Sequence, residues 1–160
     1  MFGLFKKEFK VLSPLNGKMV PLESVPDPVF SQRIVGDGVA IDDLQGDIAC
    51  APVDGTIVLI FRTNHAFAVK MKNDVEILVH IGIDTVELNG EGFERLVEEG
   101  SVVKAGDPVI RFNRNVIVTS GRSIISPVII TTKENIAQLS VNVVKQVSTG
   151  KDVIFSYKLK

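Results

Sequence analysis

The sequence contains few of the residues on which much protein chemistry depends. Its 160 residues include one cysteine, two histidines and no tryptophan. A single cysteine excludes an intramolecular disulfide and any paired-cysteine metal or redox motif. The two histidines, His65 and His80, exclude every site that needs three imidazoles.

The chain also lacks an excess of charge of either sign. It has 18 Lys and Arg residues against 19 Asp and Glu residues, whereas a nucleic-acid-binding protein carries a basic excess or stripe. No apolar run approaches the roughly 20 residues that span a bilayer. The first ten residues, Met1–Lys10, lack the apolar region and cleavage site of a signal peptide. We therefore expect a cytoplasmic protein that binds no nucleic acid and makes at most peripheral contact with a membrane.

Short runs rich in Val and Ile dominate what is present, and Gly, Pro, Asn or Asp separate them. This pattern is typical of many short antiparallel strands joined by turns. The expected strands are Lys10–Ser13, Gly17–Pro21, Gly38–Asp42, Gly46–Ala49, Gly55–Ile60, Ala66–Met71, Glu76–Ile81, Ser101–Val103, Pro108–Phe112, Ile124–Ile130, Val141–Gln146 and Asp152–Lys158.

Helix signals are few and short. An apolar i, i+3, i+4 pattern beginning at Phe93 predicts a helix near 92–99. The capping-box spacing of Thr131–Glu134 predicts a second near 132–139. Two helices of this length cannot supply the crossover connections that a parallel sheet requires.

A weak internal repeat indicates the architecture. The segment Ser13–Gly17 resembles Ala51–Gly55, and Ser126–Val128 echoes its first part. Duplicated strand–turn units predict two similar sheets folded on each other. We expect an all-β antiparallel sandwich or barrel that forms a single domain over residues 11–160.

Residues 1–10 are expected to be a flexible N-terminal segment. Its Phe and Lys residues also fit a short amphipathic helix at a membrane surface, although about ten residues form a marginal helix in water.

The two histidines are the candidate chemical groups. His65 follows the predicted strand Gly55–Ile60, and His80 ends the apolar run Val75–His80. Strand alternation places Leu78 and His80 on one face. Each histidine alone is compatible with a buried structural role. If their strands pair, the two rings share one site that can bind a metal, perform acid–base chemistry or carry a phosphoryl group.

Several segments together resemble one family, the glucose-type enzyme IIA proteins of the sugar phosphotransferase system. The resemblance extends from about Ser13 to Pro108, and more loosely to Ile130. The segments that carry it are Val25–Phe30, Ile34–Ile41, Ala51–Ile57, Thr63–Phe67, Val75–Leu88 and Gly90–Phe93.

The resemblance implies a phosphotransferase component with a phosphohistidine intermediate. Its donor is the histidine-phosphocarrier protein, and its acceptor is the IIB domain of a glucose-type sugar permease. The accepting position matches His80 through its Nε2 atom, and His65 matches a second histidine that stabilises the phosphoryl group. Thr63 and the Gly82 carbonyl match groups that orient the two rings.

The resemblance also assigns the surroundings of the site. Asp27 and Asp84 match carboxylates that flank it, and Asp37 and Glu87 extend the acidic rim. We expect the carboxylates to favour onward transfer by repelling phosphate. An apolar ring that docks the partner proteins is expected from Val29, Phe30, Val35, Phe61, Phe67, Leu78 and Val86, each of which is equally compatible with core packing. The basic stretch Arg111–Val116 departs from the family pattern.

Phosphotransfer in the family needs no cofactor. The two histidine positions can also hold zinc in a regulatory complex in which a docked target completes the shell, so His65 and His80 are candidate shared zinc ligands. Regulated permeases or kinases are further candidate partners, and a monomer is expected. The sugar depends on the permease and is not encoded in these residues.

Three alternatives remain open at this stage. A biotinyl or lipoyl carrier domain uses similar hairpins, but its modified lysine sits between methionines, whereas the order here is Lys70–Lys72 around one methionine. A zinc peptidase has a sequence motif similar to His80–Asp84, but it also needs a His-x-His motif, which this sequence lacks. A purely regulatory binding protein is the third.

Overall fold

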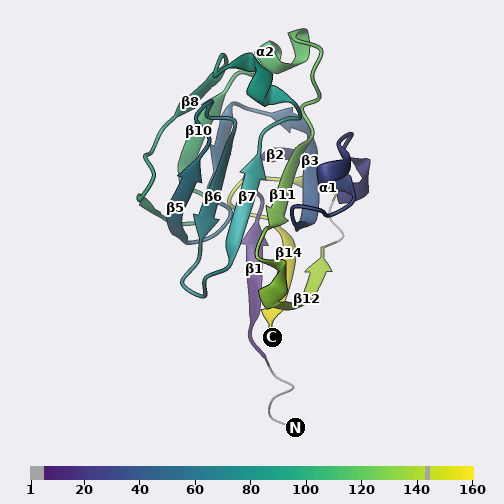
Figure 1. Cartoon of the computed structure of the whole chain (residues 1–160), viewed down its shortest axis with the longest axis vertical. Helices are drawn as coiled ribbons and strands as arrows, with labels where there is room; N and C mark the ends of the chain where they lie inside the picture. The colour runs from purple at the N-terminus through teal and green to yellow at the C-terminus, as the bar shows by residue number, and fades with distance from the viewer. Residues whose placement is uncertain (1–5, 143–144) are drawn as a thin grey trace.

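Antiparallel β-strands are the main regular elements of the structure, a computed structural model that describes residues 6–142 and 145–160 (Figure 1). The largest sheet has eight strands in the order β13-β2-β3-β11-β7-β6-β5-β9. Its strands are β2 (Asn16–Pro21), β3 (Asp37–Gln45), β5 (Gly55–Ile60), β6 (Ala66–Lys70), β7 (Glu76–His80), β9 (Val102–Val103), β11 (Ser126–Ile130) and β13 (Gln146–Val147).

Two three-stranded sheets complete the fold, with the orders β1-β14-β12 and β4-β10-β8. Their strands are β1 (Glu8–Leu12), β14 (Val153–Leu159), β12 (Ile136–Val141), β4 (Ile48–Cys50), β10 (Pro108–Phe112) and β8 (Phe93–Arg95). The start of β1 and the end of β14 lie at the same end of the molecule in Figure 1. The antiparallel all-β class predicted from the short Val and Ile runs is confirmed.

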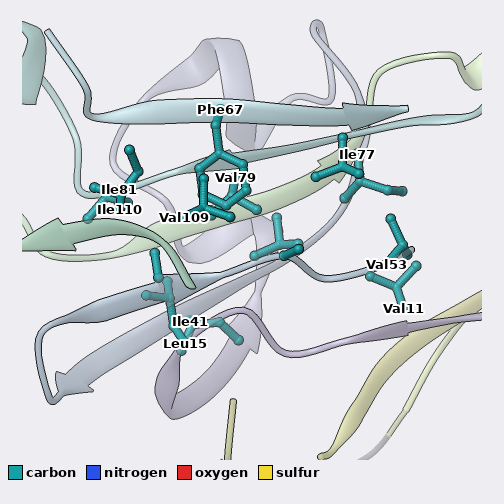
Figure 2. Packing of buried hydrophobic residues seen from close by; sticks show 14 of the residues in the cluster. Val11, Leu15, Ile41, Val53, Phe67, Ile77, Val79, Ile81, Val109 and Ile110 are labelled. Atoms are coloured by element: carbon teal, nitrogen blue, oxygen red, sulfur yellow. The ribbon is translucent and has the colours of Figure 1, made fainter. Parts of the chain in front are cut away.

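One hydrophobic cluster joins all three sheets. Val11 of β1, Ile77 of β7 and Val109 of β10 belong to it, and each is fully buried (Figure 2). Burial of Val and Ile side chains contributes roughly 1.5–3 kcal/mol each. This shared core makes the eight-stranded sheet a rigid base for the side chains on its opposite face.

A second, smaller cluster lies on that opposite face. Ala40 of β3 and Ile129 of β11 pack there against Leu22 and Phe30. Leu22 begins the 3-10 helix Leu22–Ser24, and Phe30 lies in the short helix α1 (Pro28–Ser31). The chain between β2 and β3 therefore covers one part of the outer face beside β7.

The short helices lie elsewhere than predicted. Residues 93–95 form β8, because Phe93 and Arg95 pair with Phe112 and Ile110 of β10. Gly90 and Gly92, at φ of 91° and 84°, precede the strand in conformations that exclude a helix. Strand pairing therefore overrides the short i, i+3, i+4 pattern of this segment.

The predicted helix near 132–139 is also wrong except for the 3-10 turn Lys133–Asn135. Ile136 and Leu139 lie in β12, which pairs with β14 and changes register between Ile136 and Gln138. A bulge adds one residue to the strand, so side chains three positions apart face the same side. Ile136 and Leu139 both pack on the core, and their separation of three residues is also the spacing expected of one helical turn.

Other segment boundaries also differ. The strand expected over Val141–Gln146 is instead the end of β12 and the start of β13, and residues 143–144 between them lie outside the described residues. At the N-terminus, Glu8–Lys10 belong to β1 and pair with β14, while residues 1–5 lie outside the described residues. The amphipathic helix considered for residues 1–10 is incompatible with β1 from Glu8 onward.

Two α-helices were not predicted. In α1, Asp27 caps the N-terminus and Pro28 occupies the first turn, where its missing N–H is harmless. In α2 (Arg114–Thr119), the Asn113 side chain accepts a hydrogen bond from the Val116 N–H at 3.3 Å. Asp-Pro and Asn caps were the available signals. None of the described helices has the length and apolar character needed to cross a bilayer.

Candidate functional site

Strands β6 and β7 bring the two histidines together. They form an antiparallel pair in which Ala66 lies opposite His80 and Lys70 opposite Glu76. The Ile81 N–H donates to the His65 carbonyl at 2.8 Å, which continues the ladder past the end of both strands. The predicted pairing of the two histidine-bearing segments is therefore present.

The two imidazoles form one edge-to-face pair. Their ring centroids are 4.9 Å apart and their planes differ by 78°. His65 is 1% exposed, whereas His80 is half-buried. His80 thus faces the surface, and His65 supports it from below.

The Gly82 carbonyl fixes the protonation of the His80 ring. His80 Nδ1 lies 2.7 Å from Gly82 O, and a carbonyl oxygen accepts hydrogen bonds only. Nδ1 must therefore carry the proton and donate it to this oxygen. In the neutral ring the lone pair then resides on Nε2, which makes Nε2 the nucleophilic atom.

The Thr63 hydroxyl is the corresponding partner of His65. Thr63 Oγ1 and His65 Nδ1 are 2.6 Å apart. A hydroxyl both donates and accepts, so it can donate to Nδ1 and leave the proton of the neutral ring on Nε2. In that tautomer His65 presents an N–H donor beside the nucleophile.

Burial keeps both imidazoles neutral at pH 7. It lowers the pKa of His65 from 6.5 to about 4, and the neighbouring His80 lowers it further in the same direction. Burial also lowers the pKa of His80 below 6.5, while the hydrogen bond to Gly82 and the carboxylates of Asp27 and Asp84 oppose this shift. A neutral imidazole is the form that can act as a nucleophile.

The turn after β7 requires glycine at position 82. Gly82 has a φ of +73°. A Cβ atom there would lie 2.7 Å from Thr85 Cγ2 and 2.9 Å from the Ser123 carbonyl oxygen. The carbonyl that orients His80 is therefore presented by a backbone conformation that other residues adopt only with strain.

Aromatic side chains surround the ring pair. The ring centroid of Phe61 lies 5.1 Å from that of His65 and 6.3 Å from that of His80. The ring centroid of Phe30 lies 5.1 Å from that of His80. The ring centroid of Phe93, which was not predicted as a site residue, lies 6.4 Å from that of His65. These rings exclude water from the sides of the imidazoles.

The residues of the predicted apolar ring differ in their exposure, and one of them does not belong to the surface. Val29 and Val86 are 41% and 52% exposed. Val35, Phe61 and Leu78 are half-buried, and Phe30 is 7% exposed beside His80. Phe67 was wrongly included, because it is fully buried in the core and lies opposite Val79. Alternation along β6 turns Phe67 inward and leaves the small Ala66 and Ala68 on the histidine face.

The acidic residues have structural partners as well as an electrostatic effect. The Asp27 carboxylate accepts from the Val29 N–H at 3.0 Å, and Asp84 is exposed in the left-handed conformation at a φ of 59°. Asp37 pairs with Arg33 at 2.8 Å. Glu87 pairs with Arg122 at 2.6 Å, so half of the expected acidic rim is already partnered.

A cavity of about 560 Å³ lies beside the basic stretch, where Arg111, Asn113 and Arg114 line it with Gly46 and Phe93. Neither histidine contributes to its wall. At the histidine site, His80 is half-buried and the nearby segments carry the exposed apolar side chains of Val29 and Val86, which suits a protein partner. The single cysteine, Cys50, is buried.

The described residues contain no group of three or more His, Cys, Asp or Glu side chains that can hold a metal ion. The His65–His80 pair supplies two ligands, and zinc sites in proteins need at least three protein ligands. A zinc ion bound here would therefore require ligands from another protein.

Sequence reasoning missed the residues that support the Gly82 turn. The Gly82 N–H donates to Ser126 Oγ at 3.0 Å, and the Ile83 N–H donates to the Ser123 carbonyl at 3.0 Å. Arg122 Nε donates to the Asp84 carbonyl at 3.0 Å. These contacts join segments about 40 residues apart, and no local motif signals them.

Comparisons with known proteins agree with this geometry. The sequence model described as "phosphoenolpyruvate-dependent sugar phosphotransferase system, EIIA 1" matches residues 9–136. A "PTS system glucose-specific EIIA component" of Oceanobacillus iheyensis is 43% identical over 148 residues, or 92% of this chain and 89% of that protein. The protein of the same name from Bacillus cereus is 42% identical over 162 residues, or 100% of this chain and 98% of that protein.

A solved structure shares the whole fold. The glucose permease IIA from Mycoplasma capricolum superimposes with a TM-score of 0.84 at 38% identity, covering 95% of this chain and 97% of that one. With the family model matching most of the chain and both relatives matching nearly all of it, the chain belongs to the EIIA type 1 family of the phosphoenolpyruvate-dependent sugar phosphotransferase system.

Proposed function

We propose that this phosphocarrier holds its phosphoryl group on Nε2 of His80. Members of the family take a phosphoryl group from the histidine-phosphocarrier protein and pass it to a IIB domain. The observation that supports His80 is its 2.7 Å bond from Nδ1 to the Gly82 carbonyl, which leaves the Nε2 lone pair free. Family membership displaces the biotinyl or lipoyl carrier and the zinc peptidase as alternatives.

The transfer step balances when the second ring nitrogen of the donor phosphohistidine carries a proton, because the donor then leaves as a neutral imidazole and the phosphorylated His80 ring takes the positive charge. The Nε2 lone pair of His80 forms the new N–P bond as the N–P bond of the donor phosphohistidine breaks, and the bonding pair returns to the donor imidazole. The His80 proton stays on Nδ1, hydrogen-bonded to the Gly82 carbonyl, throughout. The loose transition state of phosphoryl transfer needs alignment and charge stabilisation more than proton movement.

His65 is proposed to stabilise the phosphoryl group during transfer, and above all during its donation to the IIB domain. Its ring stands 4.9 Å from that of His80, and a hydroxyl donor at Nδ1 leaves Nε2–H as a donor to phosphoryl oxygens. Its pKa of about 4 keeps it neutral at pH 7. A neutral donor stabilises the transition state without the permanent ion pair that would retain the phosphate.

The surface around His80 is proposed as the docking site for both partner proteins. Val29 and Val86 supply exposed apolar area, and the side chains of Phe61 and Leu78 are half-buried. The carboxylates of Asp27 and Asp84 add negative potential near His80. An apolar patch with an acidic border fits a partner that presents apolar side chains within a basic rim.

The finer assignments follow the same surface. We propose glucose as the transported sugar, because the relatives are named glucose-specific components. We expect the protein to act as a monomer in the cytoplasm, and its phosphotransfer needs no cofactor. Regulatory binding of permeases or kinases, including a zinc ion held between His65, His80 and a partner, would use the same face and add to phosphotransfer.

The test is direct phosphorylation. The protein is incubated with labelled phosphoenolpyruvate, enzyme I and the histidine-phosphocarrier protein, and acid-labile, base-stable label is measured. His80→Gln should accept no label, whereas His65→Ala should accept label and donate it poorly to a IIB domain. Circular dichroism of both variants controls for folding. Normal labelling of a folded His80→Gln protein would overturn the assignment.

A further inference from the structure

The segment 122–126 holds the turn that orients His80. Three hydrogen bonds, each 3.0 Å long, join it to residues 82–84. Ser126 Oγ and the Ser123 carbonyl each accept a hydrogen bond from a backbone N–H of the turn. Arg122 Nε donates the third to the Asp84 carbonyl. Both segments therefore behave as one structural unit at the end of β7.

The Ser126 hydroxyl has a defined orientation. It donates its proton to the Ile124 carbonyl at 2.9 Å, so its lone pairs are left to accept the Gly82 N–H. Ser126 is fully buried, and so is Gly82. If the hydroxyl were absent, the Gly82 N–H would be a buried donor without a partner, which is unfavourable enough to displace the turn.

The position of Ser126 follows from the register of β11. Val128 of β11 pairs with Val79 of β7, so Ser126 lies two residues further along, beside Ile81. Ser126 itself pairs with Ile41 of β3. Ser126 is therefore held by the sheet and not by the turn itself. Its hydroxyl can anchor the turn because its own position is set by strand pairing.

The two peptide units that flank Gly82 are thereby fixed together. The Gly82 carbonyl and the Ile83 N–H belong to one planar peptide unit, and Ser123 O accepts from that N–H. Ser126 accepts from the N–H of the preceding unit. Glycine has more rotational freedom than any other residue, so both anchors are needed to hold the carbonyl against His80 Nδ1.

We propose that Ser126 is a positioning residue for phosphoryl transfer: its hydroxyl holds the Gly82 turn so that the carbonyl keeps the proton on His80 Nδ1 and the lone pair on Nε2. This inference rests on the proposed role of His80 as the phosphoryl acceptor. Ser126 touches neither the phosphoryl group nor the imidazole, and it acts through the Gly82 backbone.

Ser126→Ala tests the proposal, and Ser126→Thr is the conservative variant that keeps the hydroxyl. Ser13→Ala is the matched control, because Ser13 is fully buried and its hydroxyl donates to the Leu15 carbonyl at 2.6 Å, away from the histidines. The two readouts are the ring-nitrogen chemical shifts of His80 by NMR, which report its tautomer, and the rate of phosphorylation by the histidine-phosphocarrier protein.

Ser126→Ala should shift the His80 nitrogen signals toward a mixture of tautomers and slow phosphorylation about tenfold, since small misplacements of reacting groups carry costs of this order. Ser126→Thr should restore both, and Ser13→Ala should change neither. A wild-type tautomer and rate in folded Ser126→Ala would overturn the positioning role while leaving His80 as the acceptor. Failure of the wild-type protein to accept label on His80 would instead overturn the proposed function.

Discussion

Ala66 lies directly opposite His80 in the ladder between β6 and β7. A methyl group is the whole side chain at this position, so the His80 ring meets no large neighbour across the strand. His65 precedes Ala66, and its ring stacks edge-to-face on that of His80 at 4.9 Å. The pairing register thus places two imidazoles, 15 positions apart in the sequence, in one site.

Gly82→Ala should impair both stability and phosphorylation. The left-handed backbone alone costs roughly 1–2 kcal/mol, and the new Cβ would meet the Ser123 carbonyl oxygen at 2.9 Å. The matched control is Gly121→Ala, since Gly121 has a φ of +83° and nothing within 4 Å of the added atom. Denaturant unfolding should show a larger loss for Gly82→Ala, and only this variant should accept phosphate slowly. Equal losses of stability would contradict the predicted clash.

His65 should make the protein less stable in mild acid. The ordinary pKa of a histidine side chain is 6.5, whereas the pKa of His65 in the folded protein is about 4, so between these values the unfolded state binds more protons. Stability is therefore greatest above pH 6.5 and decreases as the pH falls toward 4, by about 3 kcal/mol.

Unfolding of the wild type and of His65→Gln, measured in urea at several pH values, checks this. The variant should lack the His65 part of the acid-induced loss, and the two curves should converge as the pH falls. Parallel curves over the whole range would show that His65 titrates normally in the folded protein.

The Asp84 carboxylate should matter more for donation than for uptake. Asp84→Asn removes its charge and tolerates the left-handed φ of 59°. Because the carboxylate raises the pKa of His80, the variant should titrate His80 at lower pH. We expect uptake from the histidine-phosphocarrier protein to be retained better than donation to IIB, since the carboxylate repels the bound phosphate.

Asp74→Asn is the control for that experiment, because Asp74 is an exposed aspartate at a φ of 69° in the β6–β7 turn. It should leave the His80 titration and both half-reactions unchanged. Equal losses of uptake and donation in Asp84→Asn would argue against a role in release.

Val86→Asp should weaken docking of the partner proteins. Val86 is 52% exposed beside the Gly82 turn, so a carboxylate there leaves the core intact but places charge on the apolar border. A loss of about tenfold in apparent affinity is expected, the size of a moderate interface hot spot. Val102→Asp is the control, because Val102 is 83% exposed on β9, outside the proposed docking surface. The KM for the histidine-phosphocarrier protein measures both variants, and an unchanged KM for Val86→Asp would exclude Val86 from the interface.

The sequence predicted the sheet class because the alternation of Val and Ile residues is a local signal. It also placed Leu78 and His80 on one face, in agreement with the half-buried side chains of both. Phe67 was assigned to the surface only because it lies close to His65 in the sequence. Applying the same alternation to β6 would have turned it inward with Val79.

Other features depend on contacts that no short segment contains. The bulge in β12 becomes visible only from its pairing with β14, and without it Ile136 and Leu139 have helical spacing. In the sequence, Ser126 is an ordinary residue within the expected strand Ile124–Ile130, with no local signal of a contact to Gly82. Its acceptance of the Gly82 N–H depends on the β7–β11 register, which is fixed by the assembled sheet.

The bond from His80 Nδ1 to the Gly82 carbonyl has one more consequence. In the mechanism proposed above, Nδ1 keeps its proton whether Nε2 holds a lone pair or a phosphoryl group, so the same hydrogen bond serves both states of the carrier. The backbone has no need to rearrange when the phosphate arrives or leaves. A protein that distinguishes the two states must therefore recognise the charge and volume of the phosphoryl group itself, because the surrounding backbone keeps the same conformation.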